Sequence, residues 1–215
     1  MTDQPARFPL AKVWTVISIV FGNLLPVFGV LFLDWDPGLI LILYWIENFF
    51  VGLFTVPRIL MAQGPPPTAG SVIGGTPLIA RLGTAAFFTF HYGVFWIVHG
   101  FFALLLASEI SPGESSPEEM RGFGLAIIGI LVIQAMQFWQ GWLRPRAWET
   151  ANPKMEMFLP YPRVMVLHIT VLLGAAGLNA IGAPTWTMLL LCIGKMAIEL
   201  TGTLGKNWLA KARID

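Results

Sequence analysis

Long runs of apolar residues dominate this chain, and short polar or proline-rich stretches separate them. A membrane-spanning helix needs about 20 mostly apolar residues, and six of the runs reach that length. The predicted spans cover residues 12–33, 37–59, 81–108, 121–143, 161–182 and 184–206. The pattern therefore predicts an all-α fold, a bundle of about six transmembrane helices that forms a single domain over residues 1–215.

The links between the predicted spans are short and contain few apolar residues. Residues 34–37 predict a tight acidic turn, and residues 62–76 predict a flexible loop rich in proline and glycine. Residues 144–163 mix proline, tryptophan and charge, which indicates a segment lying along the membrane surface. The run at 13–33 is too long for a signal peptide and ends without a small-residue cleavage site, so we expect a retained first helix.

Charge gives the predicted bundle an orientation. Apart from Lys195, which lies inside a predicted span, every lysine and arginine except Arg121 falls on one side of the six-helix arrangement. The positive-inside rule then places both the N- and C-termini in the cytoplasm. We therefore expect a multi-pass protein of the cell (inner) membrane.

Composition narrows the classes of protein and partner. Charged residues make up 12% of the chain, against about 25% in a typical soluble domain. The net charge of +1 gives no reason to expect a nucleic acid as partner. The single cysteine, Cys192, excludes an internal disulfide and a CxxC framework. The lipid bilayer is the expected partner, and a homo-oligomer or a larger membrane complex stays open.

An acidic residue in the second predicted span is the strongest candidate for function. On a helix, Tyr44, Glu47 and Asn48 stand at i, i+3 and i+4 and form one polar stripe. A carboxyl group in such an apolar span is costly, so it indicates a functional site with a partner elsewhere. Counting about 1.5 Å per residue places Glu47, His91 and Lys195 roughly 15 Å from the predicted cytoplasmic end, near the midplane.

These depths predict a site in which Glu47, His91 and Lys195 are in contact. Together with Asn48, Tyr44 and Asn23, which lies within about one turn of the same level, they form the candidate ion, proton or substrate site. His168 and Glu199 are expected in a second polar layer closer to the cytoplasm, and His99 nearer the outside. The pattern favours a small transporter, a channel or a proton-coupled membrane component.

Two other functions fit the same residues. A metal- or haem-dependent membrane enzyme would use His91, Glu47, His99 or His168 as ligands, although their spacing matches no recognised metal motif. A structural or assembly subunit would use the polar groups only to hold helices together. No serine-hydrolase elbow, Walker loop or zinc-protease motif is present, so enzymatic activity stays open and no cofactor is identified.

Three short motifs carry a family resemblance. They are Tyr-Trp-Ile-Glu-Asn at 44–48, Phe-His-Tyr-Gly at 90–93 and His-Gly-Phe at 99–101. With them the chain resembles a family of bacterial six-helix integral membrane proteins that is catalogued as a domain of unknown function. The resemblance extends from the first predicted span to Lys195 and Glu199. It implies a bacterial inner-membrane protein and assigns no activity or cofactor.

Overall fold

The computed structural model describes residues 28, 32, 35–65, 75–111, 113, 115–169, 193, 194, 196 and 197. Within this part of the chain, all regular structure is helical and no strand occurs. The elements are α2 (Pro37–Met61), α3 (Leu78–Ile110), α4 (Pro117–Phe138), the π-helix η1 (Trp139–Leu143), the short 3₁₀-helix η2 (Ala147–Glu149) and α5 (Pro153–Phe158). Residues 161–169 form a further helical segment after α5.

Three helices are long and apolar enough to cross a membrane. They are Pro37–Met61, Leu78–Ile110 and Pro117–Leu143, the last being α4 continued through η1. They confirm the all-α prediction for the described residues and coincide with the predicted spans 37–59, 81–108 and 121–143. The predicted spans 12–33 and 184–206 lie outside the described residues except for residues 28, 32, 193, 194, 196 and 197, and so does 161–182 beyond residue 169.

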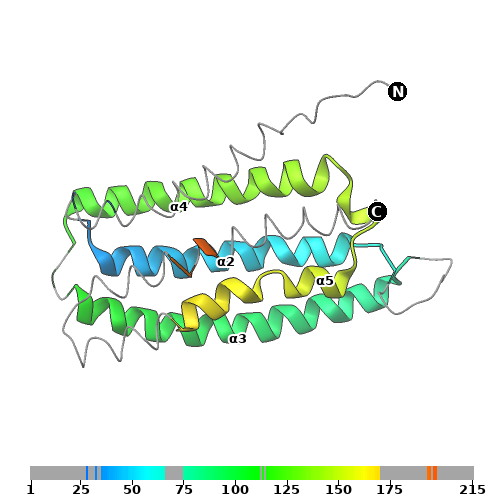
Figure 1. The fold of residues 1–215 in the computed structure, drawn as a ribbon, viewed down its shortest axis with the longest axis horizontal. Coiled ribbons are helices and arrows are strands. Elements are labelled where there is room, and N and C mark those ends of the chain that lie inside the picture. The colour runs from blue at the N-terminus through cyan, green and yellow to red at the C-terminus, as the bar shows by residue number, and fades with distance from the viewer. Residues whose placement is uncertain are drawn as a thin grey trace, which may run out of the picture.

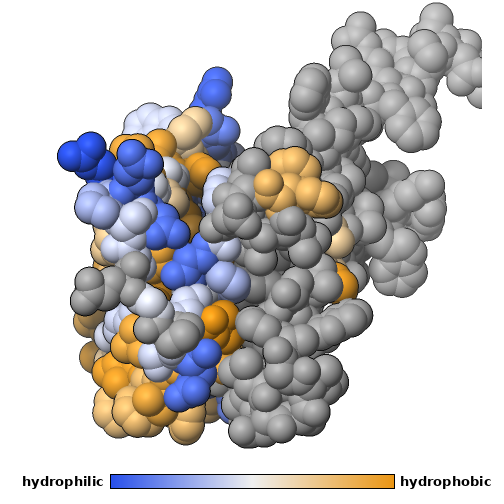
Figure 2. Space-filling model, turned by 90° about the vertical axis from the view of Figure 1, so that its left-hand side faces the viewer, coloured by the Kyte–Doolittle hydropathy of each residue, from blue (hydrophilic) through white to orange (hydrophobic). Residues whose placement is uncertain are grey.

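The three long helices run side by side, with α2 between α4 and α3 (Figure 1). α2 packs against α3, α4 and α5, and α3 also packs against α5. We call the end where α2 and α4 begin and α3 ends the Asp36 end, and the opposite end the connector end. Hydrophilic residues gather on the Asp36 end, with apolar residues around them (Figure 2).

N-cap residues and prolines mark where the helices begin. Asp36 accepts hydrogen bonds from the backbone N–H groups of Gly38 and Leu39 at 2.6 and 3.2 Å, and Pro37 occupies the first turn. The Ser111 hydroxyl, just after α3, donates to the same Asp36 oxygen at 2.5 Å. Ser116 and Glu119 form a capping box at the start of α4. Asp36 therefore both caps α2 and joins the start of α2 to the end of α3.

The segment after α4 packs against the bundle. Residues 144–163 are predicted along the membrane surface, which stays a prediction, and within them α5 packs against α2 and α3 (Figure 1). Met157 and Val164 are buried in one cluster with Ile59 and Phe88. Asn152 caps α5 and Pro153 occupies its first turn, so helical structure begins eight residues before the predicted start at 161.

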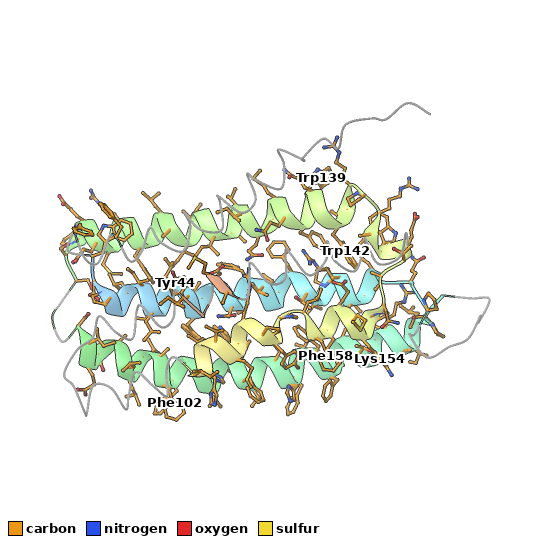
Figure 3. All side chains as sticks on the ribbon, viewed as in Figure 1. Tyr44, Phe102, Trp139, Trp142, Lys154 and Phe158 are labelled. Carbon is orange, nitrogen blue, oxygen red and sulfur yellow. The ribbon has the colours of Figure 1, made fainter. Side chains whose placement is uncertain are left out.

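Side chains divide between the interhelical space and the outside of the bundle (Figure 3). Tyr44 is buried among Leu41, Ala103 and Leu167, whereas Phe102 on the outer face of α3 is exposed. Near the connector end, Trp139 is 61% exposed and Trp142 only 3%. Large apolar side chains on the outer faces are what lipid-crossing helices require.

Candidate functional site

A pair of tryptophans joins the middle of α2 to α3. The indole rings of Trp45 and Trp96 stack with their centroids 4.5 Å apart and an interplanar angle of 9°. Each indole N–H donates to the backbone carbonyl of the other residue, at 2.9 Å from Trp45 and 3.1 Å from Trp96. Trp45 lies against Gly100, where an added Cβ would overlap its ring. Both polar edges are therefore satisfied without any other side chain.

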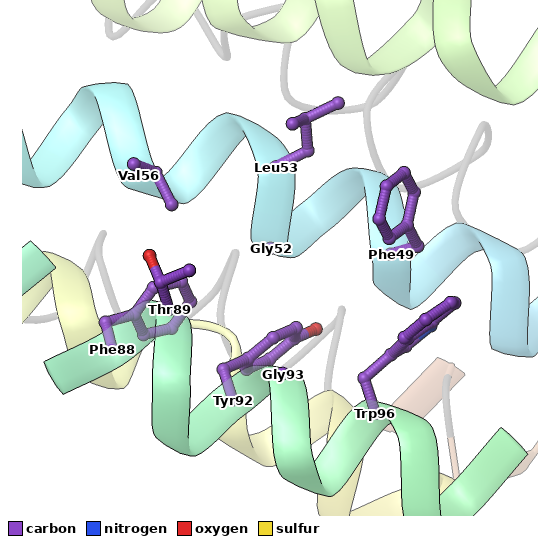
Figure 4. A pocket seen from close by; sticks show the side chains of 9 residues that line it. All are labelled: Phe49, Gly52, Leu53, Val56, Phe88, Thr89, Tyr92, Gly93 and Trp96. Carbon is purple, nitrogen blue, oxygen red and sulfur yellow. The ribbon is translucent and has the colours of Figure 1, made fainter. Parts of the chain in front are cut away.

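A second aromatic contact lies one to two turns closer to the connector end. The ring of Tyr92 packs on Gly52, and its hydroxyl donates to the carbonyl oxygen of Asn48 at 2.8 Å. Next to it is a groove of about 160 Å³ lined by both helices, to which Phe49, Phe88 and Trp96 contribute rings (Figure 4). The groove is almost wholly apolar, since the Tyr92 hydroxyl and the Trp96 indole N–H already donate to backbone carbonyls of α2.

Among the described residues, an arginine on the segment after α5 pairs with Glu47. Arg163 Nη1 lies 3.3 Å from Glu47 Oε1, and the two side chains are 25% and 15% exposed. An ion pair at this depth compensates two charges that would each be costly alone. The predicted contact of Glu47 and His91 with Lys195 cannot be followed here, since Lys195 lies outside the described residues, as do Asn23 and Glu199. Gly194 is described and packs on Val166, near Arg163.

His91 is bound by a tyrosine from the same segment. Tyr161 Oη and His91 Nδ1 are 3.0 Å apart, so one of them donates to the other. The imidazole also stacks between Phe87 and Phe95 on α3, with centroids 5.3 and 4.9 Å away. The ring is therefore held on both faces and at one nitrogen.

His99 and His168 form a direct pair, with His99 Nε2 lying 2.7 Å from His168 Nδ1. This corrects the expectation that His99 lies nearer the outside than the layer of His168. His99 Nδ1 lies 2.6 Å from the Phe95 carbonyl. Because a carbonyl can only accept, Nδ1 carries a proton, and Nε2 of neutral His99 accepts from His168 Nδ1–H.

These three contacts follow each other in order along the segment after α5. Tyr161 meets His91, Arg163 meets Glu47, and His168 meets His99. The two histidines of α3 are eight residues apart and their partners seven, so the two helical segments run parallel. We call these six residues the polar ladder. It extends over about 12 Å, a large part of the hydrocarbon core.

Glu47 and Asn48 of the predicted stripe have different partners among the described residues. The Asn48 side chain donates to the Tyr44 carbonyl on its own helix at 2.9 Å, and its backbone carbonyl accepts from Tyr92. Asn48 Oδ1 is buried and has no hydrogen-bond partner among the described residues. Of the stripe, Glu47 belongs to the polar ladder, and Asn48 belongs to the contact between α2 and α3.

The candidate metal ligands are distributed over the ladder. His99 and His168 are together, whereas His91 is with Tyr161 and Glu47 with Arg163. In the part of the chain that the structure describes, no group of three or more histidine, cysteine, aspartate or glutamate residues could hold a metal ion.

A family model covers nearly the whole chain. It is described as "Family of unknown function (DUF6498)" and matches residues 6–213. The chain belongs to the DUF6498 family. This confirms the resemblance to a family of unknown function drawn from the motifs at 44–48, 90–93 and 99–101, and the three long apolar helices of this DUF6498 chain are compatible with a membrane protein. No curated protein and no solved structure gives a significant match.

Sequence reasoning missed Tyr161 and Arg163, the two ladder residues that follow the break at 159–160. Counting from residue 161 placed them at the membrane surface of this DUF6498 protein. The signal for an earlier start was present, because Asn152-Pro153 is a helix N-cap followed by proline in the first turn. Starting the count at Pro153 moves Arg163 about 12 Å deeper, toward the level of Glu47.

Proposed function

We propose that this protein is a proton-coupled transporter of the bacterial inner membrane, with six transmembrane helices and both termini in the cytoplasm. Three long apolar helices support the membrane assignment, and the distribution of lysine and arginine supports the orientation. The observation that carries the proton coupling is the hydrogen bond between His99 and His168.

The histidine pair has room for one additional proton. In the neutral pair, His99 Nδ1–H donates to Phe95 and His168 Nδ1–H donates to His99 Nε2, so His168 Nε2 carries no hydrogen. A proton that binds there makes His168 an imidazolium and strengthens its bond to His99. If the Nδ1 proton then moves to His99 Nε2, His99 becomes the cation and His168 is left neutral with its hydrogen on Nε2.

The same geometry favours proton storage over free conduction. The other N–H of His99 points at a backbone carbonyl, which does not take up a proton, so the proton leaves by the way it came unless the pair opens. Such a site couples proton binding to a change in helix packing, as a transporter requires, whereas a channel would need an onward acceptor.

The charge balance of the polar ladder explains how proton binding is coupled to movement of a substrate. Glu47 and Arg163 cancel each other, so a proton on the histidine pair adds one positive charge to the six ladder residues, where apolar surroundings make a charge costly. That charge favours either separation of the ladder contacts or entry of an anionic group. Proton binding and movement of a substrate thereby become linked.

The protonation of the pair can be observed directly because the chain has only three histidines. Ring ¹⁵N-labelled protein in lipid bilayers is expected to show His99 protonated at Nδ1 and a coupling across the hydrogen bond between His168 Nδ1 and His99 Nε2. His91, bonded to Tyr161, serves as the internal reference. The absence of any coupling between the two rings would contradict the proposal.

Transport is tested in vesicles that enclose a pH-sensitive dye. An imposed pH gradient should collapse faster with the wild-type protein than with Glu47→Gln, in which the charge that balances Arg163 is missing. Phe90→Leu, on the lipid-facing side of α3 at 74% exposure, is the matched control and should behave as wild type. If Glu47→Gln lowers the melting temperature and leaves the proton flux unchanged, the ladder is a structural lock, as in an assembly subunit.

A further inference from the structure

The connector end carries a set of buried hydrogen-bond donors that the polar ladder does not use. Arg58 Nε, Arg81 Nε and Trp142 Nε1 are buried and have no hydrogen-bond partner in the described part of the chain. They come from α2, α3 and η1, and each lies within about one turn of the connector end of its helix. Unsatisfied buried donors are rare in native proteins, so three at one level indicate a missing acceptor.

The three donors converge on the last turn of α2. The Arg58 guanidinium carbon lies 5.6 Å from the centroid of the Trp142 ring and 6.0 Å from that of Phe138. Arg81 Nη1 donates to the Leu60 carbonyl at 3.0 Å, which brings its guanidinium to the same turn. Figure 3 places Trp142 between the ends of α4 and α2. In both arginines the Nε atom, which belongs to the edge that binds phosphate through two hydrogen bonds, is buried and has no acceptor in the described part of the chain.

Charge also points to an anion. Glu156 on α5 interacts electrostatically with Arg58, so one carboxylate stands against two guanidinium groups. Counted over these described residues, the cluster carries one positive charge. Three N–H donors with a net positive charge match a phosphodiester, which carries one negative charge and several acceptor oxygens.

The depth of the cluster fits the phosphate of a lipid. α2 has 25 residues, about 37 Å, and a hydrocarbon core is about 30 Å thick, so a few ångströms project at each end. Arg58 lies three residues before Met61, at about the level where acyl chains meet headgroups. Basic pockets between transmembrane helices at this level bind anionic headgroups.

We propose that Arg58, Arg81 and Trp142 form a binding site for the phosphate of an anionic glycerophospholipid such as phosphatidylglycerol. The inference rests on the membrane placement of the proposed function and is independent of the proton chemistry of the polar ladder. It assigns this end of the bundle a lipid ligand that binds between α2, α3 and η1.

The test measures the melting temperature of full-length protein in nanodiscs of phosphatidylcholine, with and without phosphatidylglycerol of the same acyl chains. Phosphatidylglycerol is expected to raise Tm by about 5 °C. Inorganic phosphate added to phosphatidylcholine nanodiscs separates a free anion from a lipid headgroup. A rise with phosphate alone, or no difference between the two lipid compositions, would overturn the assignment.

Variants locate the effect. Arg58→Gln with Arg81→Gln should abolish the rise, and Trp142→Phe should reduce it while keeping an aromatic ring beneath Arg58. Arg146→Gln is the matched control, because Arg146 is exposed and forms only a surface pair with Glu149. A double variant whose Tm still rises by the full amount with phosphatidylglycerol would overturn the assignment. If the double variant does not fold, an undiminished rise of Tm in Trp142→Phe would overturn it instead.

Failure here is distinguishable from failure of the proposed function. Glu47→Gln is expected to keep the full lipid effect even though it loses proton flux. If the protein does not enter nanodiscs at all, the membrane assignment itself is wrong.

Discussion

The contact between α2 and α3 and the contact of these two helices with residues 161–169 use hydrogen bonds of different kinds. Between α2 and α3, Trp45, Trp96 and Tyr92 all donate to backbone carbonyls, and rings pack on glycines. Between these helices and residues 161–169, side chains bond to side chains. Four of the six ladder residues form one ion pair and one pair of imidazoles. A backbone carbonyl has one protonation state, whereas imidazole and carboxylate have two.

This difference separates a rigid half from a responsive half. The contact between α2 and α3 keeps the same bonds at any pH in the physiological range, because none of its donors or acceptors titrates there. Under the proposed function, the polar ladder changes its bonds when one proton arrives, while the contact between α2 and α3 keeps its own.

The largest expected effect comes from removing the tryptophan stack. Trp45→Ala deletes an interhelical ring and the hydrogen bond that its indole N–H donates to Trp96, and it should lower the free energy of unfolding by about 3–5 kcal/mol. Thermal unfolding in detergent or nanodiscs measures the loss. Phe90→Ala, which removes a ring from the exposed face of α3, is the control and should cost far less. Similar losses for both variants would contradict the role given to the stack.

An intermediate effect is expected from the glycines beneath the rings. Gly52→Ala forces a methyl group into the Tyr92 ring and should destabilise the protein by about 1–3 kcal/mol. Gly93→Ala is the matched control on the same groove, because a Cβ there meets nothing within 4 Å among the described residues. It should be neutral or slightly stabilising, since alanine is the better helix former by up to about 1 kcal/mol. Equal melting temperatures for the two variants would show that the close packing at Gly52 is not needed.

The smallest expected loss of stability comes from removing single tyrosine hydroxyls, and it distinguishes the two interhelical contacts most directly. Tyr161→Phe and Tyr92→Phe each remove one hydroxyl hydrogen bond, at a cost of about 1 kcal/mol. Only Tyr161→Phe should shift the ring ¹⁵N resonances of His91, because Tyr92 donates to a backbone carbonyl. A spectrum of His91 that is unchanged in Tyr161→Phe would remove this contact from the ladder.

Much of the fold follows from the sequence, for reasons that can be named. α2, α3 and α4 lie where the apolar runs predict them, and proline in the first turn of α2 and α4 begins each helix. The site follows less well. Glu47, His91 and His168, which the sequence singles out, are half-buried and each has a side-chain partner. Counted depth gives the level of a residue and not the direction in which its side chain points.

The error in the site has one physical origin. Residues 153–160 contain charged and proline residues, so they look like a surface segment, yet Pro153, Met157 and Pro160 are buried against α2 and α3. Helix formation before the apolar run shifts every later residue of that segment by about two turns. Arg163 thereby reaches Glu47, and His168 reaches His99.

The π-helix at the end of α4 has a consequence for comparisons within the family. Its wider turn, closed by the bond from Arg144 N–H to the Trp139 carbonyl at 2.8 Å, accommodates one more residue than an α-helical turn. That extra residue sets the rotation that leaves Trp139 outside and turns Trp142 toward Arg58. In an alignment of DUF6498 sequences, the exposed Gln140 should therefore vary freely, whereas a one-residue gap between 139 and 143 should occur only in chains that have also lost the arginine at position 58.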